Sequence, residues 1–288
     1  MSITPRLLAI HAHPDDECIS TGGVLADTVA RGYHAKVLTC TDGRRGEIVD
    51  PTMDAQAVAP ILHEVREREL ANAMEILGGV DYELLGYHDS GMVGDDGNND
   101  PDTFWQANVD EAVRRVVAVI RDYQPAVVIL YDPWGGYGHP DHIQAHRVGT
   151  LAVEAAAVSA LYPEAGPAWN VPKTYQTAFT KRRVADLNAQ LIARGLSTPF
   201  GEETNPDNIV SGVYDHQVTT RIDVRNYLKT KLAALKAHKT QVHDTSHFFN
   251  FPPDLEEMFY GYETFRLVRA NHFPTTEESD IFEQLDTY

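Results

Sequence analysis

Short apolar runs that alternate with helical patterns constrain the first half of the chain most strongly. The runs with the length and composition of strands are residues 6–12, 34–41, 81–86 and 126–131. Segments with apolar residues at helical spacing or with helix-favouring composition follow them, at residues 22–30, 58–77, 104–123 and 143–160. Because right-handed crossovers through helices set strands side by side in one direction, this order favours a parallel sheet. We predict an α/β fold with a Rossmann-like, mostly parallel sheet and helices on both of its faces.

The pattern changes after about residue 162. Two further strands are expected at residues 171–179 and 217–223, and two helices near residues 182–194 and 227–239. No long linker rich in Gly and Ser separates the two halves. We therefore predict a Rossmann-like core over residues 1–162 and a smaller α+β lobe over residues 163–288, packed together as one integrated unit. Residues 279–288 are expected to form a loose acidic tail.

The charge balance excludes several classes of partner. The 24 Lys and Arg residues against 42 Asp and Glu residues give a net charge of -18. Nucleic acids and anionic membranes attract clustered positive charge, so we expect neither as a partner. No stretch is long and apolar enough for a signal peptide or a membrane helix. The only cysteines are Cys18 and Cys40, and neither belongs to a CxxC pair. We therefore predict a cytoplasmic protein whose thiols are reduced.

Two similar polar clusters follow two of the predicted strands. They are His-Pro-Asp-Asp at residues 13–16 and His-Pro-Asp-His at residues 139–142. Either cluster alone would indicate only an ordinary turn, because Pro fixes the backbone angle φ and Asp often caps the start of a helix. The carboxyl ends of neighbouring parallel strands, however, face one crevice. Two such corners therefore predict a metal site in the core, with the C-terminal lobe completing a substrate site beside it.

A hydrolytic metal site needs a few protein ligands and one open position for water. We predict His13, Asp16 and His142 as the ligands. A set of two imidazoles and one carboxylate suits Zn²⁺, and it also suits non-haem Fe²⁺. His146 lies one helical turn after His142, but we leave it out because a fourth protein ligand would close the position that water needs.

The neighbours of these ligands are candidates for catalysis. Asp15 is adjacent to Asp16 and, pointing in another direction, is expected to act as the general base. His139 is expected to stabilise an oxyanion or to protonate a leaving amine. Asp141 is expected to hold His139 in the required tautomer and to keep it cationic. Tyr137, between glycines, is expected to donate its hydroxyl to the carbonyl oxygen of the substrate.

The two clusters resemble the signature of the LmbE-like or PIG-L family of zinc-dependent N-deacetylases. That signature is His-Pro-Asp-Asp-Glu, here residues 13–17, with a later His-Pro-Asp-His, here residues 139–142. The resemblance implies the same three metal ligands. It also implies Asp15 as the base, His139 as the residue that stabilises the intermediate, and Tyr137 as a mobile tyrosine near the oxyanion.

Further segments are similar to the mycothiol branch of this family. They are residues 41–48, 66–70 and 88–92. The branch has two activities: one enzyme cleaves an amide of mycothiol S-conjugates, and the other deacetylates a glucosaminyl-inositol precursor. Residues 45–54 and 169–175 look more like the conjugate amidase, which we predict first.

The precursor deacetylase, or a related deacetylase or amidase of natural-product metabolism, is the alternative. A non-haem iron enzyme and a metal-binding regulatory module without chemistry are alternatives from other classes. The resemblance also implies a small glycoside or pseudodisaccharide substrate. It assigns Arg66 and Asp89 to contacts with the sugar–inositol hydroxyls.

Overall fold

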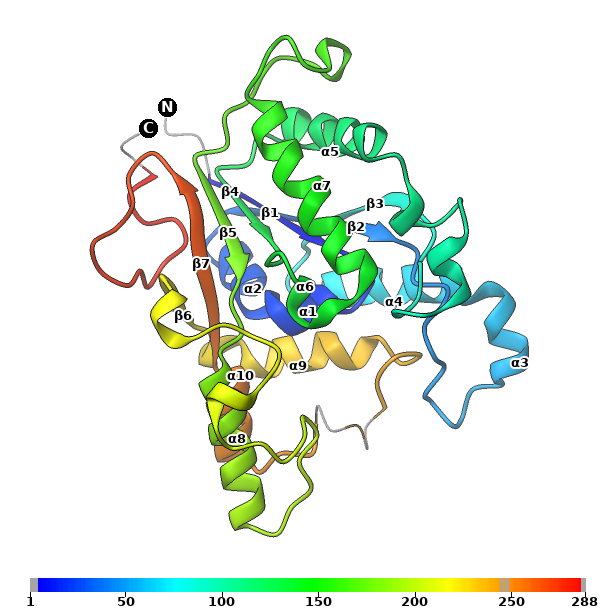
Figure 1. Cartoon of the computed structure of the whole chain (residues 1–288), viewed down its shortest axis with the longest axis vertical. Helices are drawn as coiled ribbons and strands as arrows, with labels where there is room; N and C mark the ends of the chain where they lie inside the picture. Colours follow the sequence, from blue (N-terminus) through cyan, green and yellow to red (C-terminus); the bar gives the residue numbers. More distant parts are fainter. Residues whose placement is uncertain (1–4, 244–245, 247–248, 286–288) are drawn as a thin grey trace.

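A computed structural model describes residues 5–243, 246 and 249–285. Over these residues the chain builds one seven-stranded sheet with the order β3-β2-β1-β4-β5-β7-β6 (Figure 1). The strands are β1 (Arg6–His11), β2 (His34–Thr41), β3 (Asp81–Tyr87), β4 (Val127–Leu130), β5 (Lys173–Thr177), β6 (Thr220–Asp223) and β7 (Tyr262–Ala270).

The sheet is mostly parallel, as predicted. β1 pairs in parallel with β2 and with β4, and β2–β3 and β4–β5 are also parallel. β7 runs antiparallel between β5 and β6. The chain proceeds from β1 outward to β3 and then returns to the other side of β1 as β4. The strand order therefore reverses between β1 and β4, which is where open α/β sheets bind their ligands.

Helices cover both faces of the sheet, which confirms the predicted architecture. The covering helices are α2 (Gly22–Ala30), α4 (Leu62–Ile76) and α9 (Leu228–Ala237) on one face, with α5 (Val109–Tyr123) and α7 (Pro140–Ala156) on the other. Successive residues of a strand point to opposite faces. Leu7 and Ala9 of β1 accordingly join the core under the first group, while Leu8 and Ile10 join the core under the second. No helix in the described part of the chain has both the length and the apolar composition needed to cross a membrane.

The C-terminal half extends the same sheet. β7 was not predicted from the sequence, nor was α10 (Pro253–Tyr260), which precedes it. Glu263 and Thr264 of β7 are buried although they are polar. The sequence of β7 therefore lacks the apolar run that indicates a strand inside a sheet. α8 (Lys181–Ala193) and α10 lie together beyond the end of the sheet, and their apolar sides form a small core around Leu187 and Phe259 (Figure 1).

The expectation of a loose acidic tail is wrong for residues 279–285; residues 286–288 lie outside the described part. Ile281 and Phe282 are buried against the core of the sheet. Just before them, Glu278 forms a buried ion pair with Lys173 of β5. These contacts hold the end of the chain against the sheet. In the sequence, Ile281 and Phe282 stand among acidic residues, so the segment looked like an exposed tail.

Candidate metal centre and active site

The first polar cluster forms a tight corner between β1 and the short helix α1 (Asp16–Ser20). The Asp16 carboxylate folds back over the corner and accepts the His13 backbone N–H at 2.8 Å. Asp15 has φ 117° and ψ -30°, in a region that non-glycine residues rarely occupy. Such backbone strain is worth about 1–3 kcal/mol and persists only where the surroundings enforce it.

Arg66 of α4 supports this corner from below. Its guanidinium donates to the carbonyl oxygens of Pro14 and Gly43 and lies 3.2 Å from the Asp15 carboxylate. The side chain is only 3% exposed. Arg66 therefore lies beside the site with its donors directed at the protein's own groups, and the sugar contact that the resemblance implies for it stays a prediction.

The second polar cluster begins α7. His139 is the residue before the helix, and its Nδ1 accepts the backbone N–H of Asp141. Asp141 and His142 occupy the first turn, so both side chains project toward the β1 corner. The preceding turn, α6 (Gly135–Gly138), passes close above them. Gly135 has φ +64°, and a Cβ there would lie 2.5 Å from the His142 Cβ, so only glycine fits.

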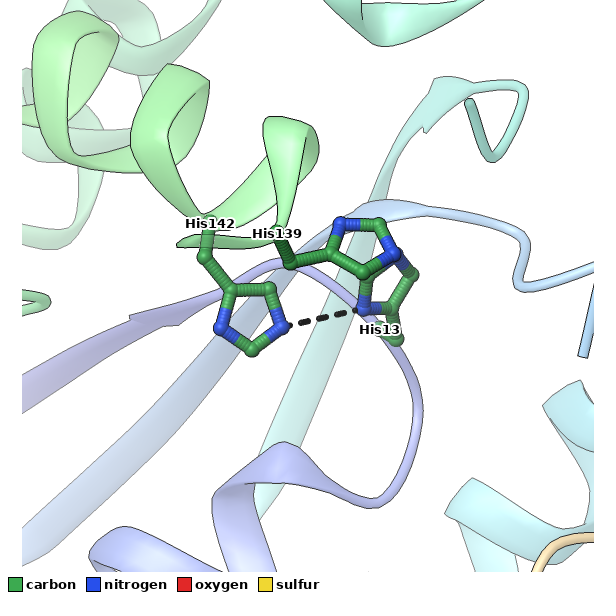
Figure 2. A group of neighbouring side chains, drawn as sticks. All are labelled: His13, His139 and His142. Atoms are coloured by element: carbon green, nitrogen blue, oxygen red, sulfur yellow. Dashed lines mark hydrogen bonds between the residues drawn. The ribbon is translucent and has the colours of Figure 1, made fainter. Parts of the chain in front are cut away.

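The structure brings the three predicted metal ligands together, and Figure 2 shows two of them, His13 and His142. His13 Nδ1 and His142 Nε2 each lie 3.4 Å from Asp16 Oδ2, and they lie 3.3 Å from each other. A tetrahedral ion held at about 2.0–2.1 Å requires ligand atoms about 3.3–3.4 Å apart. The three side chains are buried, and the triangle of donor atoms has the dimensions of a zinc-type site.

Hydrogen bonds to the other ring nitrogens leave the correct lone pairs free. His142 Nδ1 lies 3.1 Å from the Gly135 carbonyl oxygen, and His13 Nε2 lies 3.2 Å from Asp141 Oδ2. If both nitrogens donate, His142 Nε2 and His13 Nδ1 present lone pairs to the triangle. Metal-binding histidines are oriented in this way by carboxylates and carbonyls. The donor set therefore fits a divalent cation.

The electrostatic field at this point also favours a cation. Burial opposes a charge on His13, but Asp89, Asp141 and Asp16 outweigh burial and raise the pKa of His13 well above its usual value. Carboxylates that stabilise a protonated imidazole also stabilise a metal ion in the same place. His142 differs, because burial lowers its pKa to about 4 and leaves it neutral.

Asp15 and His139 lie beside the triangle, and burial shifts the pKa of both side chains. Burial raises the pKa of the Asp15 carboxyl to about 6, and the Arg66 guanidinium opposes that shift. Burial lowers the pKa of His139 to about 3, so its imidazole is neutral at neutral pH. Because Nδ1 accepts a backbone N–H, the proton of the neutral ring is on Nε2.

The role expected for Asp141 requires correction. Its carboxylate bonds His13 and both the backbone N–H and the hydroxyl of Ser90, and only its backbone N–H contacts His139. The first turn of α7 directs this side chain inward to the β1 corner, where its bonds go to His13 and Ser90 and not to the His139 ring. Asp141 therefore orients a metal-ligand candidate, and it does not keep His139 cationic.

Asp89 and Tyr137 each lie next to an imidazole of the triangle, Asp89 next to His13 and Tyr137 next to His142. Asp89 is 3% exposed, accepts the backbone N–H groups of Gly91 and Arg45, and lies 3.5 Å from His13 Nε2. Its oxygens are thus occupied by the protein. Tyr137 is half exposed, with its ring centroid 5.0 Å from that of His142.

A cavity of about 790 Å³ opens from the triangle toward the C-terminal half. Asp15, Asp16, Tyr137 and His142 line one end, whereas neither Arg66 nor Asp89 is among its lining residues. The far end is lined by residues that the sequence did not single out, among them Phe179, Phe200, Glu203, Asn208 and Ile209. They come from loops and from elements around α8, and none belongs to a short sequence motif that would have identified it as a site residue.

Tyr131 was also missed. Its hydroxyl donates to Asp16 Oδ2 at 2.8 Å, and its ring stacks on His142 with centroids 4.4 Å apart. Tyr131 directly follows β4, at the edge of the sheet where the strand order reverses. Its place at the carboxyl end of that predicted strand could have identified it as a site residue.

Comparison with known proteins identifies the family of the chain. Residues 8–153 match the family model described as PIG-L, GlcNAc-PI de-N-acetylase. The chain is 42% identical to the 1D-myo-inositol 2-acetamido-2-deoxy-alpha-D-glucopyranoside deacetylase of Geodermatophilus obscurus, over 98% of each chain. It is 40% identical to deacetylase 1 of the same description from Catenulispora acidiphila, over 96% of this chain and 88% of that protein.

Solved structures share the fold at lower identity. The N,N'-diacetylchitobiose deacetylase of Pyrococcus horikoshii matches with a TM-score of 0.61 and 20% identity, over 94% of this chain and 86% of the other. The 4-carboxy-2-hydroxymuconate hydratase of Pseudomonas putida matches equally well, with a TM-score of 0.61 and 17% identity over 94% and 99% of the two chains. The fold thus carries more than one reaction. The sequence matches are more specific, and by them the chain belongs to the PIG-L family of de-N-acetylases, hydrolases that act on amide bonds.

Proposed function

We propose that this protein removes the acetyl group from 1D-myo-inositol 2-acetamido-2-deoxy-alpha-D-glucopyranoside, in the synthesis of mycothiol. Support comes from relatives with that name that align over nearly the whole chain. The alignment includes the C-terminal half, which supplies the far wall of the cavity. This reverses the order predicted from the sequence, in which the S-conjugate amidase came first.

The metal site is assigned to His13 Nδ1, Asp16 Oδ2 and His142 Nε2. The carrying observation is the triangle of 3.3–3.4 Å separations between them. Zn²⁺ suits these ligands best, and Fe²⁺ is the alternative. When bound, such an ion polarises the substrate carbonyl and makes water a better nucleophile.

The side chains around the triangle then handle the protons. Asp15 faces the cavity as a carboxylate above a pKa of about 6, so it accepts a proton from the attacking water. Water oxygen adds to the acetyl carbon, and the C–N bond breaks as Asp15 returns a proton to the departing nitrogen. His139 Nε2–H and the Tyr137 hydroxyl donate toward the oxygen that becomes negative. The products are acetate and a free glucosamine amine.

Arg66 and Asp89 are assigned indirect roles in this scheme. Arg66 holds the Pro14 carbonyl and the Asp15 carboxylate, and Asp89 lies against His13. Both are nearly buried, so their contribution to sugar binding passes through the corner that they support.

The S-conjugate amidase remains the second candidate, because the cavity is large and its far end is partly apolar. Phe179, Phe200 and Ile209 line that end. They offer room for the thiol substituent of a conjugate.

Parallel assays decide between the two activities. The purified protein, loaded with Zn²⁺ or Fe²⁺, is incubated with the N-acetylated glucosaminyl-inositol and with a mycothiol S-conjugate, and the released amine is measured. We expect release from the acetylated compound and its loss after chelation. Release from the conjugate alone would promote the amidase, and oxygen consumption would point to an iron oxygenase.

A further inference from the structure

A buried pair of a carboxylate and an imidazole, Glu17 and His238, lies next to Asp15. Glu17 Oε1 and His238 Nε2 are 2.9 Å apart, and both side chains are fully buried. The residues are 221 positions apart in the sequence: Glu17 belongs to α1, and His238 follows the end of α9. Neither belongs to the triangle of metal-ligand candidates, and the reaction scheme above assigns them no step.

The second oxygen of Glu17 connects this pair to Asp15. Glu17 Oε2 accepts the backbone N–H of Asp15 at 2.9 Å. The carbonyl of the same peptide unit, contributed by Pro14, accepts a hydrogen bond from Arg66 Nη2. Both polar edges of the Pro14–Asp15 peptide are therefore held by buried charged side chains, one on each side.

This arrangement reverses the usual capping of a helix. The residue before a helix normally turns its side chain back to bond an N–H of the first turn. Asp15 holds that position at α1, but its side chain makes no capping bond. Instead the Glu17 side chain bonds the N–H of Asp15, as the acidic partner does in a capping box. The Asp15 carboxylate makes no bond to the helix; it pairs with Arg66 and lines the cavity.

We propose that Glu17, held in place by His238, is a positioning residue that keeps Asp15 in its left-handed conformation and so directs the Asp15 carboxylate at the attacking water. The role of Asp15 in this statement rests on the proposed function. His238 supplies the fixed point, because its ring donor holds Glu17 Oε1 while Glu17 Oε2 holds Asp15. The last turn of α9 is thereby connected to the catalytic corner.

Cys18 provides a matched control. It is buried on the same helix, and its thiol donates to the same Glu17 oxygen that His238 contacts, at 3.1 Å. Cys18→Ala therefore disturbs the carboxylate without removing its bond to Asp15. A purely structural role for this buried cluster predicts similar losses from Cys18→Ala and Glu17→Ala.

The kinetic experiment compares Glu17→Ala, Glu17→Gln and Cys18→Ala with N-acetylglucosaminyl-inositol as substrate. A misplacement of about 1 Å in a reacting group costs about 10²-fold in rate. We expect kcat of Glu17→Ala to fall by about that factor, with KM and metal stoichiometry unchanged. Glu17→Gln keeps one acceptor for the Asp15 N–H and should recover part of the loss, while Cys18→Ala should stay near wild type. Equal kcat for Glu17→Ala and Cys18→Ala overturns the proposal.

A double variant separates positioning from folding, should Glu17→Ala fail to fold. Glu17→Met with His238→Leu replaces the buried pair by apolar side chains, an exchange that often leaves stability unchanged. We expect a melting temperature near that of wild type together with the same loss of kcat. A folded double variant with wild-type kcat also overturns the proposal.

The backbone of Asp15 gives a readout that does not depend on the substrate. Crystal structures of wild type and of the double variant report φ of Asp15 directly. We expect φ to leave the value of 117° in the variant; an unchanged φ refutes the positioning role. If wild type were inactive on the acetylated glycoside, the proposed function would fail, but this structural comparison would still decide whether the pair holds Asp15.

Discussion

Removal of the Asp141 carboxylate separates the role seen in the structure from the role expected from the sequence. In the structure Asp141 Oδ2 lies 3.2 Å from His13 Nε2 and accepts the Ser90 backbone N–H at 2.8 Å. If it acts through His13, its loss weakens metal binding. If it acts through His139, its loss slows the reaction and leaves metal binding unchanged.

The magnitude follows from the contacts. Asp141→Ala removes the acceptor of three buried donors: His13 Nε2–H and both the backbone N–H and the hydroxyl of Ser90. An orphaned buried donor costs about 1–3 kcal/mol. Partners that orient a metal ligand typically contribute about 10- to 100-fold in metal affinity, which equals about 1.4–2.7 kcal/mol. We therefore expect the dissociation constant for Zn²⁺ to rise by about that factor in Asp141→Ala. Asp141→Asn retains an oxygen acceptor, and its shift should be smaller.

Competition with a chromophoric chelator measures the dissociation constant without reference to activity. Ser90→Ala serves as the control, because it removes the hydroxyl from the same carboxylate and leaves the contact with His13 intact. The reasoning is refuted if Asp141→Ala binds Zn²⁺ as tightly as wild type while its kcat falls. That result would restore the contact with His139 as the functional one.

Three further predictions follow from the same geometry. Asp16→Ala should lose stoichiometric metal, as measured by elemental analysis, whereas Asp15→Asn should keep the metal and lose about 10²–10⁴-fold in kcat; full metal content in the first variant would contradict the ligand assignment. The role proposed for Asp15 is that of a general base, and burial raises its pKa to about 6; kcat/KM of wild type should therefore fall as the pH drops below about 6, and a flat profile from pH 5 to 8 would contradict this role. Ile281→Ala should lower the free energy of unfolding in urea by about 2–5 kcal/mol, because Ile281 is buried; an effect no larger than that of the exposed Thr276→Ala would show that the chain end is not anchored.

The parallel part of the fold was predictable because its central strands, β1 and β4, are buried on both faces. Val127–Leu130 is an uninterrupted apolar run, as parallel strands covered by helices require. β7 was not predictable in the same way. It buries Glu263, whose charge is matched by Lys231 of α9 and by the backbone N–H groups of Gly23 and Val24. Its sequence is polar where its environment is buried, and only the tertiary partners explain that.

The residues of the site differ in the same way: some were predictable from local motifs, and others depend on tertiary contacts. His13, Asp16 and His142 were predictable because each belongs to a short motif at a strand end, where the fold fixes the direction of the corner. The partner of Asp141 was not, because its carboxylate lies near both His139 and His13, and only the packing of α7 against the β1 corner selects His13. The contact between Glu17 and His238 was not predictable either, since it joins residues 221 positions apart.

This division has a consequence for specificity. The triangle and Asp15 come from the corners after β1 and β4, whereas the far wall of the cavity comes from the C-terminal half. Groups that only line the far wall contact the part of the substrate that does not react, so they contribute to binding of the ground state and the transition state alike. Substitutions such as Phe200→Ala should therefore raise KM and leave kcat and metal affinity unchanged, while Asp15→Asn should lower kcat and leave KM unchanged. The pocket can thus change its substrate by changes in the C-terminal half without disturbing the geometry that cleaves the amide.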